Sequence, residues 1–131
     1  MALVVEQIEG YRKLVVWKNA KRLRALVFQL TIPFPKSELK RISQMRDAAR
    51  SVKQNIQEGY SRKHLGEYLH ALEISKGSLA ELQGDLEDSY EDGLLTVSGF
   101  EEAYRLCKQT DYLFVRLLTA LRKRRVTVES L

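Results

Sequence analysis

The sequence contains few of the residues that interrupt helices or form covalent crosslinks. Its 131 residues include two prolines, seven glycines and one cysteine. A single cysteine cannot form an internal disulfide, and the scarcity of proline and glycine leaves long segments in which helices can form without interruption. We therefore expect a helix-rich chain without a disulfide framework.

Long hydrophobic runs are also absent. No apolar run approaches the roughly 18 residues that a membrane span needs. The first ten residues contain Glu6 and Glu9 but no Lys or Arg, so they lack the charged start of a secretory signal. Together with the lone Cys107, these features predict a cytoplasmic protein that does not partner with a membrane.

The motifs of common enzymes are missing as well. The sequence has no glycine-rich phosphate loop, no cysteine cluster and no Ser-His-Asp signature. Glu67 and His70 form one Glu-x-x-His unit, whereas di-iron helical bundles use two such units. The only other histidine, His64, has no carboxylate three residues before it. We expect no enzymatic activity, no catalytic residue, no metal ligand and no cofactor.

What the sequence does contain is helical periodicity, most clearly between Ile42 and Gly59. Apolar residues recur there at steps of three and four, which predicts a helix with one buried face. They are Leu39, Ile42, Met45, Ala49, Val52 and Ile56. Arg46, Arg50 and Lys53 stand at i, i+4 and i+7 on the opposite side, where we expect one exposed cationic face. Gly59 is expected to end this helix as a left-handed cap.

Similar patterns predict four helices, over about residues 12–31, 37–58, 65–90 and 98–123. Asp92-Gly93 is a turn signal, and Ser98 with Glu101 forms a capping box for the last helix. Ser75 occupies a core position, and the small Gly77 and Ser78 permit close approach of another helix. Four helices with short connections predict a single all-α domain over residues 1–131, an antiparallel up-down-up-down four-helix bundle.

Charge is distributed unevenly along the chain. From Tyr11 to His64, fourteen Lys or Arg face three Asp or Glu, a net charge of +11. From Leu65 to Leu121, four Lys or Arg face eleven Asp or Glu, a net charge of −7. Because the first two helices of such a bundle are neighbours, their cations are expected to form one basic surface.

The basic surface is open to three interpretations. It is suited to binding nucleic acid, because cations that neutralise phosphates give salt-dependent affinity with weak sequence specificity. Alternatively it meets the acidic hairpin of another subunit, or it only solvates the helix exteriors. We favour the first interpretation, for RNA or DNA. The candidate nucleic-acid-binding residues are Lys18, Lys21, Arg22, Arg46, Arg50, Lys53, Arg62 and Lys63.

The stretch around Ile42–Gly59, together with the later Gly77–Leu82, resembles a known family signature. The family is that of the four-helix-bundle proteins encoded in intervening sequences of 23S ribosomal RNA genes. It also includes the accessory variability proteins of diversity-generating retroelements. The residues that carry the resemblance are Gln44, Arg46, Ala48, Ala49, Ser51, Asn55, Ile56, Glu58 and Gly59, with Val16-Trp17-Lys18 and Ala20 near the start. Lys53 departs from it, because relatives usually have proline there, and His64 replaces a serine cap.

The resemblance implies a bacterial homopentamer, a ring of five subunits. Its retroelement branch implies a protein adaptor for a reverse transcriptase, whereas its ribosomal branch implies an oligomer in an RNA-gene context. The sequence leaves both open. A neighbouring reverse transcriptase gene would favour the adaptor.

Two groups of residues allow both a structural and a functional interpretation. The motif residues Asn55, Glu58 and Gly59 either hold a neighbour or organise the helix end, and we favour the second role. Tyr60 and Tyr68 either stack on unpaired bases or pack at the edge of the bundle. The sequence does not assign a role to the basic tail Arg122 to Arg125.

Overall fold

The computed structural model describes residues 14–130, with the side chains of residues 14–124. The main elements are the helices α2 (Val15–Thr31), α3 (Leu39–Tyr60), α4 (Leu65–Glu91) and α5 (Val97–Ser130). A short 3₁₀ turn, η2 (Lys36–Glu38), precedes α3. No strand occurs among the described residues, and the expected all-α four-helix bundle is confirmed.

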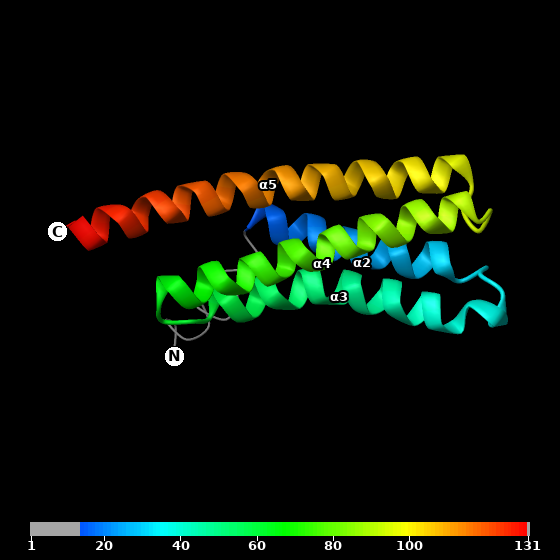
Figure 1. Cartoon of the computed structure of the whole chain (residues 1–131), viewed down its shortest axis with the longest axis horizontal. Helices are drawn as coiled ribbons and strands as arrows, with labels where there is room; N and C mark the ends of the chain where they lie inside the picture. The colour runs from blue at the N-terminus through cyan, green and yellow to red at the C-terminus, as the bar shows by residue number, and fades with distance from the viewer. Residues whose placement is uncertain (1–13, 131) are drawn as a thin grey trace.

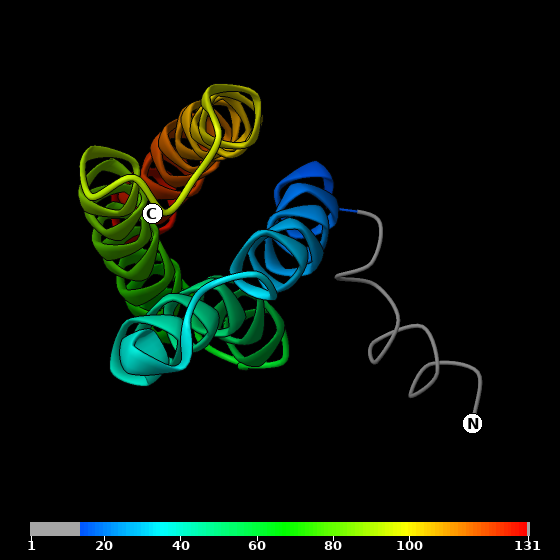
Figure 2. The same ribbon diagram turned by 90° about the vertical axis from the view of Figure 1, so that its right-hand side faces the viewer.

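Consecutive helices run in opposite directions (Figure 1), as the up-down-up-down prediction requires. Each helix contacts its sequence neighbours, and α2 also contacts α5, which closes the bundle. Seen end-on, the helices lie at the corners of a four-sided arrangement (Figure 2). Within the described residues α2 and α4 make no direct contact, so they occupy opposite corners.

The apolar stripes face the centre of the bundle, as predicted. Val16, Ala20, Leu23 and Val27 of α2 are buried, and so are Met45, Ala49, Val52 and Ile56 of α3. Ser75 is buried on α4, and its hydroxyl donates to the main-chain carbonyl of Val52. The prediction for Leu39 is wrong, because its side chain is 67% exposed. Leu39 begins α3 at the end of the bundle, where buried Phe34 from the preceding connection covers the core.

Several helix boundaries differ from those expected. The predicted start at residue 12 lies outside the described residues. The last helix continues to Ser130 rather than ending near residue 123, since no glycine or proline follows to stop it. It consequently extends beyond the other three helices (Figure 1).

The turn before α5 contains both expected and unexpected capping. Gly93 has a φ of 76°, and the N–H groups of Gly93 and Leu94 donate to the carbonyls of Tyr90 and Ser89, which is a Schellman motif. The Asp92-Gly93 turn is therefore present. The predicted Ser98–Glu101 capping box is wrong, because the Thr96 hydroxyl accepts from the Gly99 N–H at 3.0 Å and caps α5 two residues earlier.

Gly59 does not cap α3. The helix continues through it to Tyr60, and Gly93 is the only glycine with positive φ among the described residues. Instead Gly59 is buried against α4, where an added Cβ would lie 2.8 Å from the Ala71 Cβ. Gly77, expected to provide close helix contact, has open space around it. Gly59, and not Gly77, thus permits the close approach of α3 and α4.

These two glycines provide a matched test. Gly59→Ala should destabilise the protein by about 1–3 kcal/mol, because the new methyl group overpacks the α3–α4 contact. Gly77→Ala should stabilise it by up to about 1 kcal/mol, the usual gain where a helix has room for the methyl group. Urea unfolding followed by circular dichroism measures both. Equal effects of the two substitutions would contradict the packing role of Gly59.

Candidate nucleic-acid interface

Helix α2 carries an exposed set of cations. Its four charged residues, Lys18, Lys21, Arg22 and Arg24, are all basic and all exposed. Among the side chains described, none of them forms an ion pair with a carboxylate. We call these four residues the α2 cations, and they are available to an external anion.

The cations predicted on α3 are less uniform than expected. Arg50 is exposed, whereas Arg46 and Lys53 are half-buried on the side that packs against α2. Arg46 donates from Nε to the Thr31 hydroxyl at 2.9 Å, and its guanidinium carbon lies 4.3 Å from the centre of the Phe28 ring. The side chains of Arg46 and Lys53 follow the seam between α2 and α3, so the expected single exposed face is only partly present.

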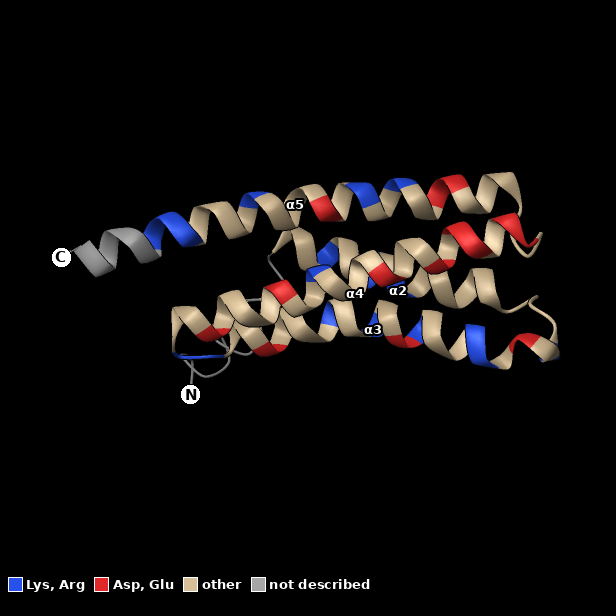
Figure 3. Cartoon of the chain, in the orientation of Figure 1, with Lys and Arg blue, Asp and Glu red and all other residues tan. Residues whose placement is uncertain are grey.

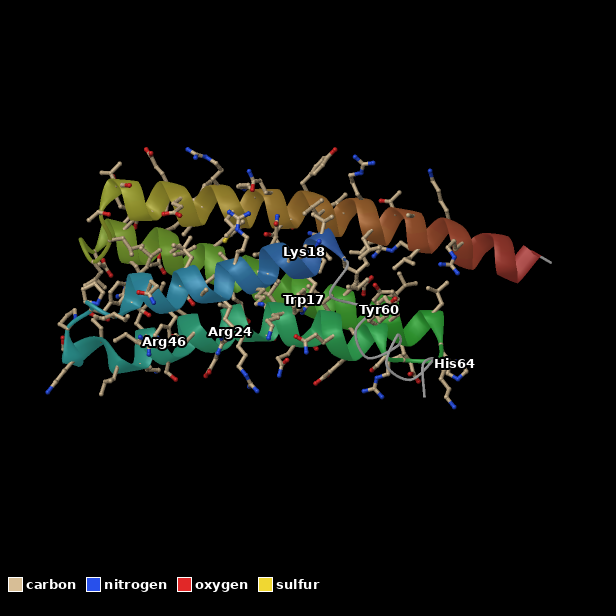
Figure 4. The ribbon with its side chains drawn as sticks, turned by 180° about the vertical axis from the view of Figure 1, so that it is seen from behind. Trp17, Lys18, Arg24, Arg46, Tyr60 and His64 are labelled. Carbon is tan, nitrogen blue, oxygen red and sulfur yellow. The ribbon has the colours of Figure 1, made fainter. Side chains whose placement is uncertain are left out.

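Trp17 lies in this seam as a structural contact. Its side chain is 8% exposed, and its indole N–H donates to Gln57 Oε1 at 2.9 Å. The ammonium groups of Lys21 and Lys53 lie 5.6 and 5.9 Å from the ring. Figure 4 shows Trp17 and Arg24 on the side of α2 that faces α3. Trp17 therefore fixes α2 on α3 and orients two cations at the surface.

The sequence predicted a basic first hairpin and an acidic second hairpin. Within the second hairpin the charge is unevenly divided between the two helices. Lys and Arg outnumber Asp and Glu by four to none in α2, by five to two in α3 and by six to three in α5 up to Arg124. Only α4 is acidic, with seven Asp or Glu against Lys76. Figure 3 shows this contrast. The excess in α5 lies at its end, in Arg122, Lys123 and Arg124, and up to Leu121 the two signs balance. Because α2 lies between α3 and α5, the α2 cations have a basic helix on one side and a neutral one on the other, and the acidic helix is diagonally opposite.

The acidic side is centred on an open groove between α3 and α4. This groove has a volume of about 560 Å³ and is lined by Asp47, Glu81, Asp85 and neutral residues. Burial raises the pKa of the Asp85 carboxyl, and the neighbouring Asp88 and Glu81 raise it further. Carboxylates crowded in this way repel phosphate, so this face is unsuited to nucleic acid.

The predicted motif residues lie along the contact between α3 and α4. The Asn55 amide donates to the Ser51 carbonyl at 2.9 Å and to the Ser51 hydroxyl at 3.0 Å. That hydroxyl in turn shares a 2.8 Å hydrogen bond with Ser78 of α4. Glu58 is exposed and borders, with Arg62, a separate groove of about 480 Å³. Asn55 and Gly59 are thus occupied in helix packing.

The connection from α3 to α4 holds the remaining predicted cations. Arg62, Lys63 and His64 are exposed at the end of the bundle. The Tyr60 and Tyr68 rings pack edge to face, with centroids 6.1 Å apart. Burial raises the pKa of Tyr68 to about 12. These tyrosines serve bundle packing and leave the cations of the connection at the surface.

Sequence reasoning missed the role of Arg41. Its guanidinium pairs with Glu38 at 2.9 Å and with Asp92 at 2.7 Å, and it also donates to the buried Ser89 hydroxyl. The hydrogen bond to Asp92 raises the Arg41 pKa. The i+3 spacing from Glu38 was visible in the sequence, but the contacts with the end of α4 were not. Arg41 thus ties the start of α3 to the end of α4, at one end of the bundle.

The described residues contain neither a group of side chains arranged to hold a metal ion nor a helix long and apolar enough to cross a bilayer. Cys107 is buried, and burial raises the pKa of its thiol to about 12.

Comparison with known proteins identifies one family. Residues 12–115 match the sequence model of the 23S rRNA-intervening sequence protein family. The match spans α2, α3, α4 and the first half of α5, and so includes the α2 cations and the contact between α3 and α4. A comparison with curated proteins gave no match.

The different environments of the α3 cations predict different costs of substitution. Arg46→Gln should lower the free energy of unfolding by about 1–2 kcal/mol, because it removes a charged hydrogen bond and a cation–π contact. Arg50→Gln should change it by no more than about 0.5 kcal/mol, as is usual for an exposed position. Denaturant unfolding of the two variants checks this. A decrease for Arg50→Gln as large as that for Arg46→Gln would contradict the assignment.

Proposed function

The chain belongs to the 23S rRNA-intervening sequence protein family, and we propose that it is a non-enzymatic protein that binds nucleic acid through the α2 cations. The observation that carries this proposal is the position of α2. Its four exposed cations lie between the basic α3 and α5, which is neutral up to Leu121, with the acidic helix on the opposite corner. A phosphate backbone approaching α2 meets attraction from α2 and α3 and no net repulsion from α5.

Binding through these cations is governed by electrostatics. Each Lys or Arg that neutralises a phosphate releases a condensed counterion, so affinity falls steeply as salt is added. Contacts to phosphate position a protein on the backbone without reading the sequence. We therefore propose broad binding to RNA and DNA, supported at the bundle end by Arg62 and Lys63.

As the alternative use of the α2 edge, we propose that copies of the chain assemble into a homo-oligomer. The acidic α4 and the basic α2 occupy opposite corners, so the α4 edge of one copy is electrostatically complementary to the α2 edge of the next. A contact between different edges generates a ring when its rotation closes. The resemblance to the wider family implies five subunits, and a ring closed through this contact would cover the α2 cations and compete with nucleic acid for them.

The first test removes three cations of α2. The variant Lys18→Gln, Lys21→Gln, Arg22→Gln should bind RNA and duplex DNA more weakly than the unaltered protein, by a similar factor for unrelated sequences. The slope of log affinity against log salt should become shallower by about 0.9 for each duplex phosphate that is no longer neutralised, or about 0.7 for single strands. Fluorescence anisotropy at several salt concentrations measures both quantities.

A matched control separates position from total charge. Lys36→Gln, Lys40→Gln, Arg124→Gln removes the same charge from the bundle end and from the end of α5. It should leave the salt slope nearly unchanged. If both triple variants weaken binding equally, affinity depends only on the net charge of the protein, and the assignment of the binding site to α2 is wrong.

Assembly is tested by light scattering at micromolar concentration. The particle mass should be a multiple of 15.2 kDa. Glu81→Lys with Asp88→Lys should reduce the mass to one chain, because it places like charges at the proposed contact. The control Glu101→Lys with Glu102→Lys, at the start of α5, should leave the mass unchanged. A monomeric unaltered protein would rule out the oligomer.

A further inference from the structure

The outward face of α5 carries a stripe of cations interrupted by one aromatic residue. Arg105, Lys108, Tyr112 and Arg116 follow one another at steps of three and four, and all are exposed. Tyr112 is 59% exposed, the largest fraction of any aromatic side chain described. A large ring held in water among cations has no role in the core of the bundle.

Beside this ring is a groove between α5 and α2. The groove has a volume of about 460 Å³ and is lined by Asn19 of α2 with Lys108, Gln109, Tyr112 and Leu113 of α5. The exposed lining of the groove is almost entirely apolar, and Leu113 and the tyrosine ring are part of it. An open apolar surface beside an exposed ring suits the face of a planar heterocycle.

Neighbouring residues orient the ring and keep its surroundings positive. The Arg116 guanidinium donates to the Tyr112 hydroxyl at 3.3 Å, and its central carbon lies 5.8 Å from the ring centre. The adjacent Asp111 is paired with Lys76 of α4 at 3.3 Å, which offsets the nearest negative charge. Tyr112 is therefore placed where a phosphate-bearing ligand is attracted.

Other aromatic residues of the bundle are committed elsewhere. Tyr60 and Tyr68 pack against each other, and Tyr90 stacks on Phe100 with ring centroids 4.5 Å apart. Trp17 is buried in the seam between α2 and α3. Tyr112 combines high exposure with a position next to a groove.

We propose that Tyr112 is a stacking platform for an unpaired nucleobase, which lies over the groove between α2 and α5 while its flanking phosphates contact Lys108 and Arg116. The inference rests on the proposed nucleic-acid binding and names its ligand as single-stranded nucleic acid. A base in a duplex already has its faces covered by neighbouring pairs, so it cannot stack on the ring. Stacking on an aromatic side chain is tolerant of base identity.

The test compares Tyr112→Ala and Tyr112→Phe with the unaltered protein. The probes are oligouridine and oligothymidine of about 12 nucleotides, within the usual site size of such interfaces, an abasic strand of the same length and a duplex. Tyr112→Ala should lower affinity for oligouridine, oligothymidine or both by about 5- to 150-fold, the range for removing one stacked base. The oligonucleotide that responds identifies RNA or DNA as the ligand. Affinity for the abasic strand and for the duplex should not change.

Two further measurements distinguish stacking from other roles. Tyr112→Phe should retain affinity, since it keeps the ring and removes only the hydroxyl, and the salt slope of Tyr112→Ala should match that of the unaltered protein because no charge is removed. Val115→Ala, at a 46% exposed position on the same helix, is the matched control and should have no effect. Light-induced crosslinking of 5-iodouracil oligonucleotides should occur at Tyr112.

The outcomes separate this inference from the proposed function. If the unaltered protein binds no nucleic acid, the proposed function fails and the stacking platform fails with it. If the unaltered protein binds nucleic acid and Tyr112→Ala binds every probe as tightly as the unaltered protein does, only the stacking platform is overturned. Weaker binding by Tyr112→Phe would also overturn it, because the hydroxyl and not the ring would then be responsible.

Discussion

The close contact between α3 and α4 is the constraint on which the rest of the bundle depends. Small residues lie on both sides of this contact. Gly59 packs so closely against Ala71 that a Cβ on Gly59 would not fit, and the Ser51 hydroxyl hydrogen-bonds to the Ser78 hydroxyl. Ser75 satisfies its buried hydroxyl on the Val52 carbonyl. Polar side chains can be buried here because each one has a partner, and backbones can approach because the side chains are short. The small residues of the family signature at this contact, Ser51, Gly59 and Ser78, therefore serve to pack α3 against α4.

This fixed hairpin determines where the charges lie. Helix α2 packs between α3 and α5, and Trp17 and Arg46 secure it on α3 through Gln57 and Thr31. The acidic α4 is then as far from α2 as the bundle allows. The result is a molecule with one basic edge and one acidic edge, and both proposals, nucleic-acid binding and self-assembly, use that separation.

Arg46, a cation of the family signature, has a packing role. Arg46 is half-buried and bonded to Thr31, so a substitution there changes stability before it changes any surface. Lys18, Arg22 and Arg50 differ from it, because they are exposed and form no hydrogen bond with another helix among the described residues. Experiments on the interface are therefore most informative at positions that packing does not use.

Much of the fold was determined by the sequence alone. Apolar residues at steps of three and four place four helical faces in a common core, because burial of those faces is the main favourable term in folding. The number and order of the helices, their alternating direction and the basic character of the first two followed from this pattern. The buried Ser75 was also predicted, since it falls at a core position of its stripe.

Only the tertiary structure decided which residues face a neighbour and which face water. The spacing of apolar residues shows on which side of a helix each residue lies, but it does not show how closely the next helix approaches. Gly59 was for that reason expected as a cap and is instead a packing contact, while Arg46 and Lys53 were expected to be exposed and instead follow the seam with α2. The pairing of α5 with α2 likewise joins residues far apart in the chain, so the site at Tyr112 and Asn19 could not be derived from the sequence. Sequence determines the faces of helices, whereas contacts over long sequence separation depend on three-dimensional packing.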